Sequence, residues 1–296
     1  MKPLIINTFR QLRNVITPLN LLVSVAVLLF AIYCNYYAGI KLWPGVHSSY
    51  TFFQLLILFF FFSAAGVLLV SQQTDPRKAD VQKLPLFLLL SSAMFATKIS
   101  LPFYQLLEPL SPSLQQAFHQ PAYWIGGVVF ISISILLYHK WDHQSWGMYF
   151  TKKPVAFSPY LLLLLLMLPL LFFAATQADF QVVYPRSKVL QVIDHPQWYH
   201  YSLFEFTYAL DFITIELFFR GFLLAVLSRW LGTKSILPVA LFYFSIHLGK
   251  PMLEAFSSFW GGLILGSISI QTKSIWGGWI VHVGIALLME LLGYLI

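Results

Sequence analysis

The chain has 296 residues, of which 58% are hydrophobic and only 10% are charged. Soluble globular domains carry roughly a quarter of charged residues, so this composition excludes an ordinary soluble domain and indicates a multi-pass membrane protein. The net charge of +7 does not indicate a nucleic-acid partner, because the basic residues are scattered over loops rather than gathered in a patch.

The apolar runs are long and continuous, which favours helices over the alternating strands of a membrane barrel. About 20 apolar residues span a bilayer as a helix. Residues 1–18 mix basic and apolar side chains, a pattern typical of a short helix on the cytoplasmic surface. The expected fold is all-α, a multi-pass transmembrane helical bundle of about eight to nine spans. We expect the spans at about 20–39, 51–71, 84–104, 123–139, 156–177, 201–228, 234–248, 252–270 and 276–295.

The loops predict the topology, since cytoplasmic loops are enriched in Lys and Arg. With nine spans, twelve basic residues fall on the side of the N-terminus and four on the other. This predicts a plasma-membrane protein with a cytoplasmic N-terminus and a C-terminus outside the cytoplasm. If the segment 84–104 were re-entrant rather than spanning, the number of basic residues on each side would change. Lys98 and Arg220 lie within spans, and Lys98 is expected to reach the interface. The twelve are Lys2, Arg10, Arg13, Arg77, Lys78, Lys83, Lys140, Lys152, Lys153, Arg229, Lys234 and Lys273, and the four are Lys41, Arg186, Lys188 and Lys250.

The acidic residues are distributed unevenly along the chain. The first six lie in predicted loops, whereas the last five lie in or at the ends of predicted spans. An ionisable group at the centre of a membrane helix costs roughly 2.5–3.5 kcal/mol. We therefore interpret residues 1–200 as a membrane-helix framework and residues 201–296 as the part that carries the chemistry. The last five are Glu205, Asp211, Glu216, Glu254 and Glu290.

The helical period arranges the charges of span 201–228. Glu216 and Arg220 are four residues apart, so they share a face and can form an ion pair. Glu205 falls near the same face, whereas Asp211 points elsewhere. This stripe should face the bundle interior or a water-filled cavity. Taken alone, these two charges are better explained by a purely structural ion pair between Glu216 and Arg220.

Two histidines add chemistry to this part of the chain. His247 lies near a helix end that Gly249 and Pro251 break, and His282 lies in the last span. Each alone could be a packed, hydrogen-bonded residue, and Glu254 alone could be an interfacial charge. Together, a carboxylate, a guanidinium and two imidazoles on three helices can activate a water molecule. The expected site uses no cofactor, and a zinc ion held by Glu216, His247 and His282 is the second choice, because no His-Glu-x-x-His motif is present. Cys34 is the only cysteine, so a cysteine-based metal cluster is excluded.

At these residues the chain resembles the CPBP family of CAAX proteases and bacteriocin-processing intramembrane proteases, also called Abi. Its three motifs are Glu-Glu-x-x-x-Arg, Phe-x-x-x-His and His-x-x-x-Asn/Asp. They align here with 215–220, 243–247 and 282–286. The resemblance covers roughly residues 201–296 and implies that Glu216, Arg220, His247 and His282 belong to a proteolytic site.

Two positions depart from the family motifs. Ile215 stands where the family has the glutamate taken as general base, and Ala286 stands where it has the Asn or Asp associated with the oxyanion. Three outcomes follow: Glu216 acts as base, another carboxylate reaches His247, or the protein binds without cleaving. Glu254 is the first choice for that other carboxylate, and Asp211 is the second.

The function expected from these features is intramembrane proteolysis in the lipid bilayer. The substrate would be a membrane-associated peptide or a lipidated protein, cleaved by a water molecule that glutamate and histidine activate. A catalytically inactive member that binds a peptide partner, as an immunity or assembly factor, is the alternative that Ile215 and Ala286 motivate. A small-solute transporter would use the same buried charges, but no inverted repeat is evident.

Overall fold

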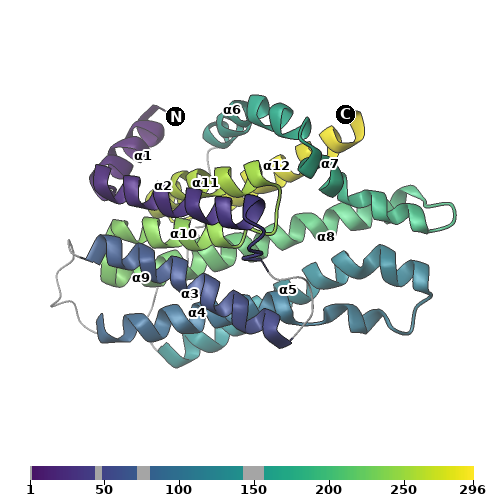
Figure 1. Cartoon of the computed structure of the whole chain (residues 1–296), viewed down its shortest axis with the longest axis horizontal. Coiled ribbons are helices and arrows are strands. Elements are labelled where there is room, and N and C mark those ends of the chain that lie inside the picture. Colours follow the sequence, from purple (N-terminus) through teal and green to yellow (C-terminus); the bar gives the residue numbers. More distant parts are fainter. Residues whose placement is uncertain (1, 44–48, 72–80, 143–156) are drawn as a thin grey trace.

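The computed structural model describes residues 2–43, 49–71, 81–142 and 157–296. The elements of these residues are helical, with η marking 3-10 or π-helical turns (Figure 1). They are, in chain order, α1 (Lys2–Val15), α2 (Pro18–Ile32), η1 (Tyr33–Tyr37), α3 (Ser49–Ser71), η2 (Val81–Lys83), α4 (Leu84–Ser100), η3 (Phe103–Leu107), α5 (Pro112–Asp142), α6 (Ser158–Ala175), α7 (Ala178–Val183), η4 (Arg186–Val192), α8 (Trp198–Glu216), η5 (Leu217–Leu224), α9 (Ala225–Leu231), η6 (Gly232–Ser235), α10 (Ile236–Ser245), α11 (Met252–Thr272) and α12 (Trp276–Leu295).

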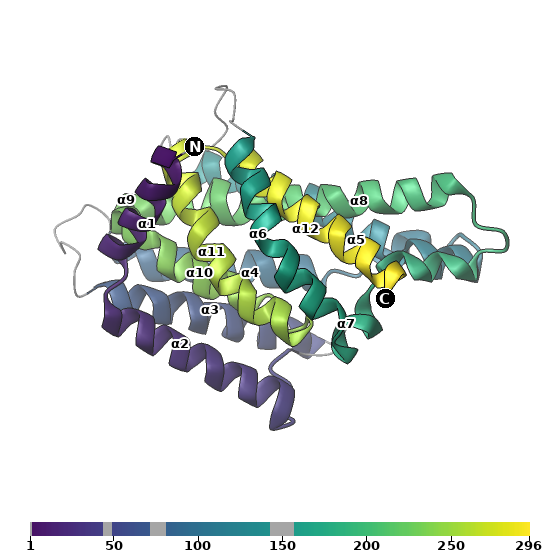
Figure 2. The same ribbon diagram turned by 90° about the horizontal axis from the view of Figure 1, so that it is seen from above.

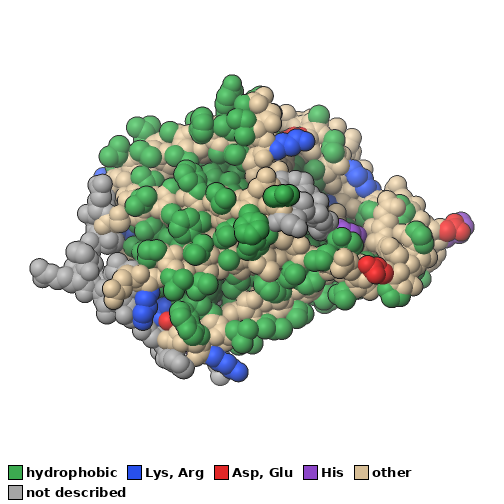
Figure 3. Space-filling view, turned by 60° about the horizontal axis from the view of Figure 1, so that its bottom comes forward, with side chains coloured by type: hydrophobic (Ala, Val, Ile, Leu, Met, Phe, Trp, Pro, Cys, Tyr) green, Lys and Arg blue, Asp and Glu red, His purple; other side chains and the backbone are tan. Residues whose placement is uncertain are grey.

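The helices form a multi-pass bundle, which confirms the expected fold class. Seven segments of the described chain are long and apolar enough to cross a membrane. Apolar side chains cover the face shown in Figure 3, and charged side chains lie toward its ends. A surface of this kind suits the hydrocarbon core of a bilayer, with the charges near the interfaces. The seven are 18–37, 50–71, 84–107, 112–142, 158–175, 252–272 and 276–295.

Two further predicted spans are helical but are not among these seven. The predicted span 201–228 is part of a continuous helix of α8, η5 and α9, which carries five charged side chains. The predicted span 234–248 is α10, which has only 10 residues. Its last turn is replaced by irregular turns that precede Pro251, because proline disfavours a helical conformation of the residue before it.

The start of the predicted span 123–139 was wrong by about three turns. Helix α5 begins at Pro112 and contains Pro121 in its interior. In a membrane bundle, local adjustments and neighbouring helices can satisfy the carbonyl group that an internal proline leaves free. The segment 84–107 is a candidate span of 24 residues, which favours a crossing over a re-entrant loop there.

The central layer of the bundle is formed by α10 packed between α3 and α11, and α12 packs against α6 and α8 (Figures 1 and 2). Aromatic rings fill the core where these layers meet. The Phe242 ring of α10 lies 5.1 Å from Phe59 of α3 and 5.3 Å from Phe219 of η5. Burial of such large apolar side chains fixes the helix that carries the site against the framework.

Contacts between loops define one end of the bundle, which we call the site end. The hydroxyl of Tyr36 lies 2.6 Å from the carbonyl oxygen of Lys250, and the hydroxyl of Tyr184 lies 3.1 Å from Glu254. The site end therefore gathers the segments 33–43, 184–193 and 246–254.

Candidate active site

Glu216 and Arg220 form the buried centre of the site. Both side chains have no exposed surface, and Nη1 of Arg220 lies 3.2 Å from Oε1 of Glu216. The orientation is that of an ion pair rather than of a hydrogen bond. The guanidinium also lies over the ring of Tyr243, 4.5 Å from its centroid. The ion pair expected from the spacing of four residues is thus confirmed.

His282 of α12 joins Glu216 to Tyr243 of α10. Its Nδ1 atom lies 2.8 Å from Oε1 of Glu216, and its Nε2 atom lies 2.8 Å from the hydroxyl oxygen of Tyr243. A carboxylate at this distance favours the proton on Nδ1, so Nε2 accepts a hydrogen bond from the Tyr243 hydroxyl. The ring stacks on Phe212 of α8 at an angle of 22°. Both nitrogens of His282 therefore have a polar neighbour, and the contact of Nδ1 with Glu216 has the distance of an ion pair without the orientation of a hydrogen bond.

His247 lies in the turn that follows α10, where Gly249 and Pro251 interrupt the helical pattern. Its Nδ1 atom lies 2.8 Å from the carbonyl oxygen of Tyr243. Since a carbonyl only accepts, Nδ1 carries a proton, and Nε2 of the neutral ring keeps its lone pair. In the part of the chain that the structure describes, Nε2 makes no hydrogen bond. Tyr243 thus links the two histidines, through its carbonyl and its hydroxyl.

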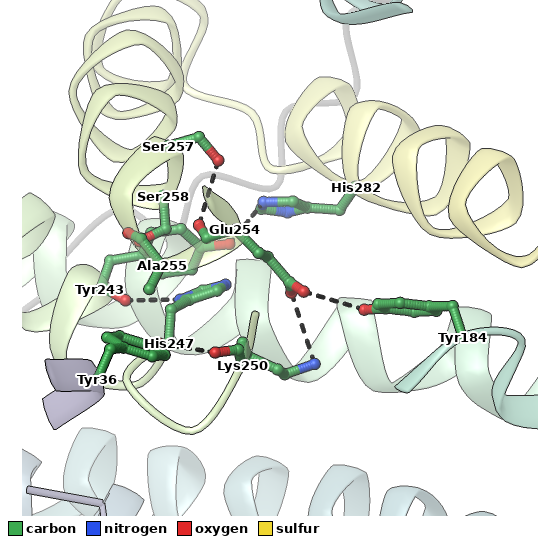
Figure 4. Close-up of polar contacts among 10 residues, drawn as sticks. All are labelled: Tyr36, Tyr184, Tyr243, His247, Lys250, Glu254, Ala255, Ser257, Ser258 and His282. Atoms are coloured by element: carbon green, nitrogen blue, oxygen red, sulfur yellow. Dashed lines mark hydrogen bonds and ion pairs between the residues drawn. The ribbon is translucent and has the colours of Figure 1, made fainter. Parts of the chain in front are cut away.

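Glu254, in the first turn of α11, is the carboxylate on the side of His247. One carboxylate oxygen accepts a hydrogen bond from the hydroxyl of Tyr184 at 3.1 Å, and the other lies 3.6 Å from Nζ of Lys250 (Figure 4). Glu254 and His247 interact electrostatically. The side chain of Glu254 is 20% exposed, whereas that of Glu216 is completely buried. Glu254 is therefore the accessible carboxylate of the site.

Glu290 was expected near the exit of the last helix, and the structure gives it a definite structural role. Its carboxylate accepts hydrogen bonds from the backbone nitrogens of Arg186 and Ser187, at 2.8 and 3.2 Å, and from the Ser187 hydroxyl at 2.7 Å. These bonds fix the start of η4 against α12. They also place the guanidinium of Arg186 over the ring of Tyr184, 5.5 Å from its centroid.

Within the predicted stripe on the helix 201–228, the two glutamates face α12, whereas the guanidinium of Arg220 lies over Tyr243 of α10. Glu205 interacts electrostatically with Glu290 of that helix, and Glu216 contacts His282 of the same helix. The period of an α-helix predicted this shared direction correctly, although Arg220 lies in the π-helical turn η5.

Asp211 lies on another face, as predicted, but it does not reach His247. Its Oδ1 atom lies 2.9 Å from Nζ of Lys98, which is only 3% exposed and also lies over the ring of Tyr123. The expectation that Lys98 extends to the membrane interface was therefore wrong. A buried acidic partner on a neighbouring helix can hold an ammonium group that would otherwise reach for water.

The two departures from the family motifs lie in apolar surroundings. Ile215 is 9% exposed and belongs to the main apolar core, together with Phe218. Ala286 is 3% exposed and packs in a cluster that contains Trp124 and Phe204. Neither position holds a polar side chain that could take part in hydrolysis.

The residues of the metal alternative do not gather as a metal site. Among the described residues, no group of three or more His, Cys, Asp or Glu side chains could hold a metal ion. Both nitrogens of His282 are engaged by Glu216 and Tyr243, so His282 has no lone pair directed at a shared position with His247.

Sequence reasoning missed three residues of the site. Tyr243 was considered only as the aromatic position of a motif, and Tyr184 and Lys250 were not considered as site residues. Tyr243 could have been found, because position 243 is one turn before His247 on the same helix face. Tyr184 could not, because its contact with Glu254 joins positions 70 residues apart.

An apolar cavity of about 700 Å³ lies apart from these polar groups, between η3, α5 and the first half of α8. Apart from Thr207, its lining is apolar. The side chains that define it include Phe103, Leu106, Phe118, Ile125 and Leu203.

A helical membrane bundle thus holds a buried cluster of Glu216, Arg220 and His282, together with Glu254 and His247, which interact electrostatically. These residue types are those used for acid–base chemistry. Residues 197–288 match the family model described as Type II CAAX prenyl endopeptidase Rce1-like. This part of the chain is an Rce1-like domain of the CPBP (Abi) family of proteases. Comparison with curated proteins and with solved structures finds no match.

Proposed function

We propose that the protein is an intramembrane endopeptidase that cleaves membrane-associated peptides or lipidated proteins. The observation that carries this proposal is the pairing of an accessible carboxylate, Glu254, with His247, whose Nε2 atom is free to meet a water molecule. The family match supports peptide hydrolysis as the reaction class.

In the proposed reaction, Glu254 accepts a proton from the water as the water oxygen adds to the peptide carbonyl carbon. The proton then passes through Nε2 of His247 to the leaving amine as the C–N bond breaks, which leaves a carboxylic acid and an amine. The hydroxyl of Tyr184, 3.1 Å from one carboxylate oxygen of Glu254, and Nζ of Lys250, 3.6 Å from the other, orient this carboxylate. Glu216 is completely buried, so its role is to set the protonation and orientation of His282 rather than to meet the substrate.

The site lies in a helical bundle, where a substrate would arrive through the bilayer. The apolar cavity near α8 suits a hydrocarbon chain, because pockets with apolar linings bind apolar groups by removing them from water or lipid contacts. This supports a substrate that carries a lipid. A lipidated peptide should then be cleaved faster than the same peptide without its lipid, and Leu203→Trp, which fills the cavity, should reduce this difference.

The decisive experiment supplies a labelled peptide library to the purified protein in nanodiscs. Wild type should cleave peptides, and His247→Ala and Glu254→Gln should each lower kcat by about a hundredfold or more, as expected for loss of acid–base groups. Lys188→Gln serves as a control, because Lys188 is exposed and its ammonium group donates to the backbone carbonyls of Gln181 and Val182. Equal turnover by wild type and His247→Ala would overturn the proposal.

A non-catalytic, peptide-binding member is the second candidate. The apolar surroundings of Ile215 and Ala286 favour it, because these positions lack the polar side chains that the family motifs carry. Wild type would then retain a peptide in nanodiscs without cleaving it, and cleavage would appear only in the double variant Ile215→Glu, Ala286→Asn. Cleavage by wild type rejects this candidate.

A further inference from the structure

The turn that carries His247 is held by residues that lie outside the segment matched to the Rce1-like family. The side-chain amide of Asn35 donates to the carbonyl oxygen of Leu248 at 2.8 Å. The hydroxyl of Tyr36 donates to the carbonyl oxygen of Lys250 at 2.6 Å and lies 3.2 Å from that of Leu248. Two carbonyl groups of the turn, which no helix satisfies, thus find their donors in η1.

The ring of Trp43 completes this support. A side-chain carbon at Gly249 would collide with the Trp43 indole, so the turn and the indole are in direct contact only because position 249 is a glycine. The backbone nitrogen of Trp43 donates to Oδ1 of Asn35 at 3.3 Å. The amide of Asn35 is therefore oriented, with its nitrogen directed at the turn and its oxygen directed at Trp43.

A π-helical turn presents these donors. Residues Tyr33–Tyr37 form η1, in which the extra residue per turn changes the directions of successive side chains. Asn35 and Tyr36 reach the turn, whereas Tyr33 is 59% exposed and Tyr37 is 67% exposed. Without the extra residue of η1, the side chains that follow it would be rotated by about 100° about the helix axis. Asn35 and Tyr36 would then not both reach the turn that carries His247.

We infer that Asn35, Tyr36 and Trp43 are positioning residues that hold the 246–251 turn and thereby fix His247 and Lys250 in the site. Figure 4 shows Tyr36 beside His247 and Lys250. The inference rests on the proposed function for its effect on catalysis. The hydrogen bonds themselves make the N-terminal framework part of the site, which the Rce1-like segment alone does not complete.

The test compares two matched tyrosine variants of η1 in the full-length protein in nanodiscs. Tyr36→Phe removes the hydroxyl that binds the turn, and Tyr33→Phe removes an exposed hydroxyl from the same π-helical turn. We expect Tyr36→Phe to lower kcat about ten- to a hundredfold, as misplacement of catalytic groups does, with KM nearly unchanged. Tyr33→Phe should cleave like wild type.

Amide hydrogen exchange of residues 246–252 gives a readout that does not depend on activity. Exchange there should be faster in Tyr36→Phe and in Asn35→Leu than in wild type and Tyr33→Phe, with exchange in α12 unchanged. Faster exchange in a protein that cleaves no peptide would support the positioning role and reject only the proposed function. Unchanged exchange, or faster exchange with the kcat of wild type, would overturn the inference.

Discussion

At the residue scale, Gly278 determines how closely α12 approaches the buried carboxylate of Glu216. A β-carbon at position 278 would collide with that carboxylate. Gly278→Ala should therefore displace Glu216 or α12 and lower the free energy of unfolding by about 1–3 kcal/mol, the usual cost of overpacking. It should also weaken peptide cleavage, because the contact of Glu216 with His282 depends on the same approach. Chemical unfolding in detergent measures the first effect.

The chain offers a matched control for this substitution. Gly261 lies on α11, and a β-carbon there would meet no atom within 4 Å. Gly261→Ala should leave stability unchanged or raise it by about 0.4–1 kcal/mol through the unfolded state. Equal losses in the two variants would contradict the steric explanation.

Lys250, in the turn between α10 and α11, should titrate well below an ordinary lysine. Burial of its ammonium group and the nearby charge of Arg186 together lower the pKa to about 8, against the opposite effect of Glu254. Because the folded-state pKa lies below that of the unfolded chain, this group contributes stability above pH 10.5, and the contribution is lost as the pH falls through about 8.

Nuclear magnetic resonance of dimethylated lysines can follow this titration. One signal, absent in Lys250→Arg, should shift near pH 8. In Arg186→Gln its midpoint should rise, since removal of a like charge favours the ammonium form. In Lys188→Gln, which removes an exposed charge of η4, the segment that also carries Arg186, the titration midpoint should stay at the wild-type pH. A midpoint that is the same in all three backgrounds would exclude an influence of Arg186.

At the element scale, the buried pair of Lys98 and Asp211 joins α4 to α8. Removal of one partner leaves the other charged and unpaired in an apolar environment. Asp211→Ala should therefore lower the free energy of unfolding by about 3–5 kcal/mol. The double variant Lys98→Met, Asp211→Leu should recover most of this loss, because apolar side chains of similar size replace a buried pair at little cost. Unfolding of wild type, Lys98→Met, Asp211→Leu and their double variant in detergent forms a double-mutant cycle, and additive losses would show that the two residues do not interact.

Elements and local pairs could be predicted from the sequence, whereas contacts between helices could not. The continuous apolar runs indicate helices, and a spacing of four residues predicts the pair of Glu216 and Arg220. The partner of Lys98 lies 113 residues away, so no local period reveals it. The expectation that Lys98 reaches the interface considered only its own helix, which is why it failed.

The location of the site could be predicted, but its internal connections could not. The sequence placed His247 at a broken helix end and His282 in the last span. It did not show that Tyr243 joins them, because that link combines a contact between α10 and the turn after it with a contact between α10 and α12. The question of which carboxylate is accessible depends on burial, which distinguishes Glu254 from Glu216 only in the folded chain.

At the scale of the whole molecule, the site end and the C-terminus lie on the same side of the bundle. Glu290, near the end of α12, binds the backbone of Arg186 and Ser187. The distribution of Lys and Arg predicts that this side faces away from the cytoplasm. Four residues of that count, Arg77, Lys78, Lys152 and Lys153, lie outside the described residues, so the topology stays a prediction.

Reporter fusions test this prediction. A reporter that is active only outside the cytoplasm should be active after Ile296 and inactive at the N-terminus. A second reporter, active only in the cytoplasm, should give the opposite result at both positions. A cytoplasmic signal at the C-terminus would contradict the nine crossings and would place the turn of His247 on the cytoplasmic side.

The ion pair of Glu216 and Arg220 also bears on how the protein enters the bilayer during synthesis. Its two members lie four residues apart in one helical segment, so the charge of the arginine can be neutralised before any other helix arrives. An arginine whose partner belonged to a later helix would have to enter the hydrocarbon core alone, at a cost of roughly 2.5–3.5 kcal/mol on insertion scales. The pair at the centre of the site can thus enter the bilayer without net charge, and His282, the last contributor, completes the cluster only when α12 follows.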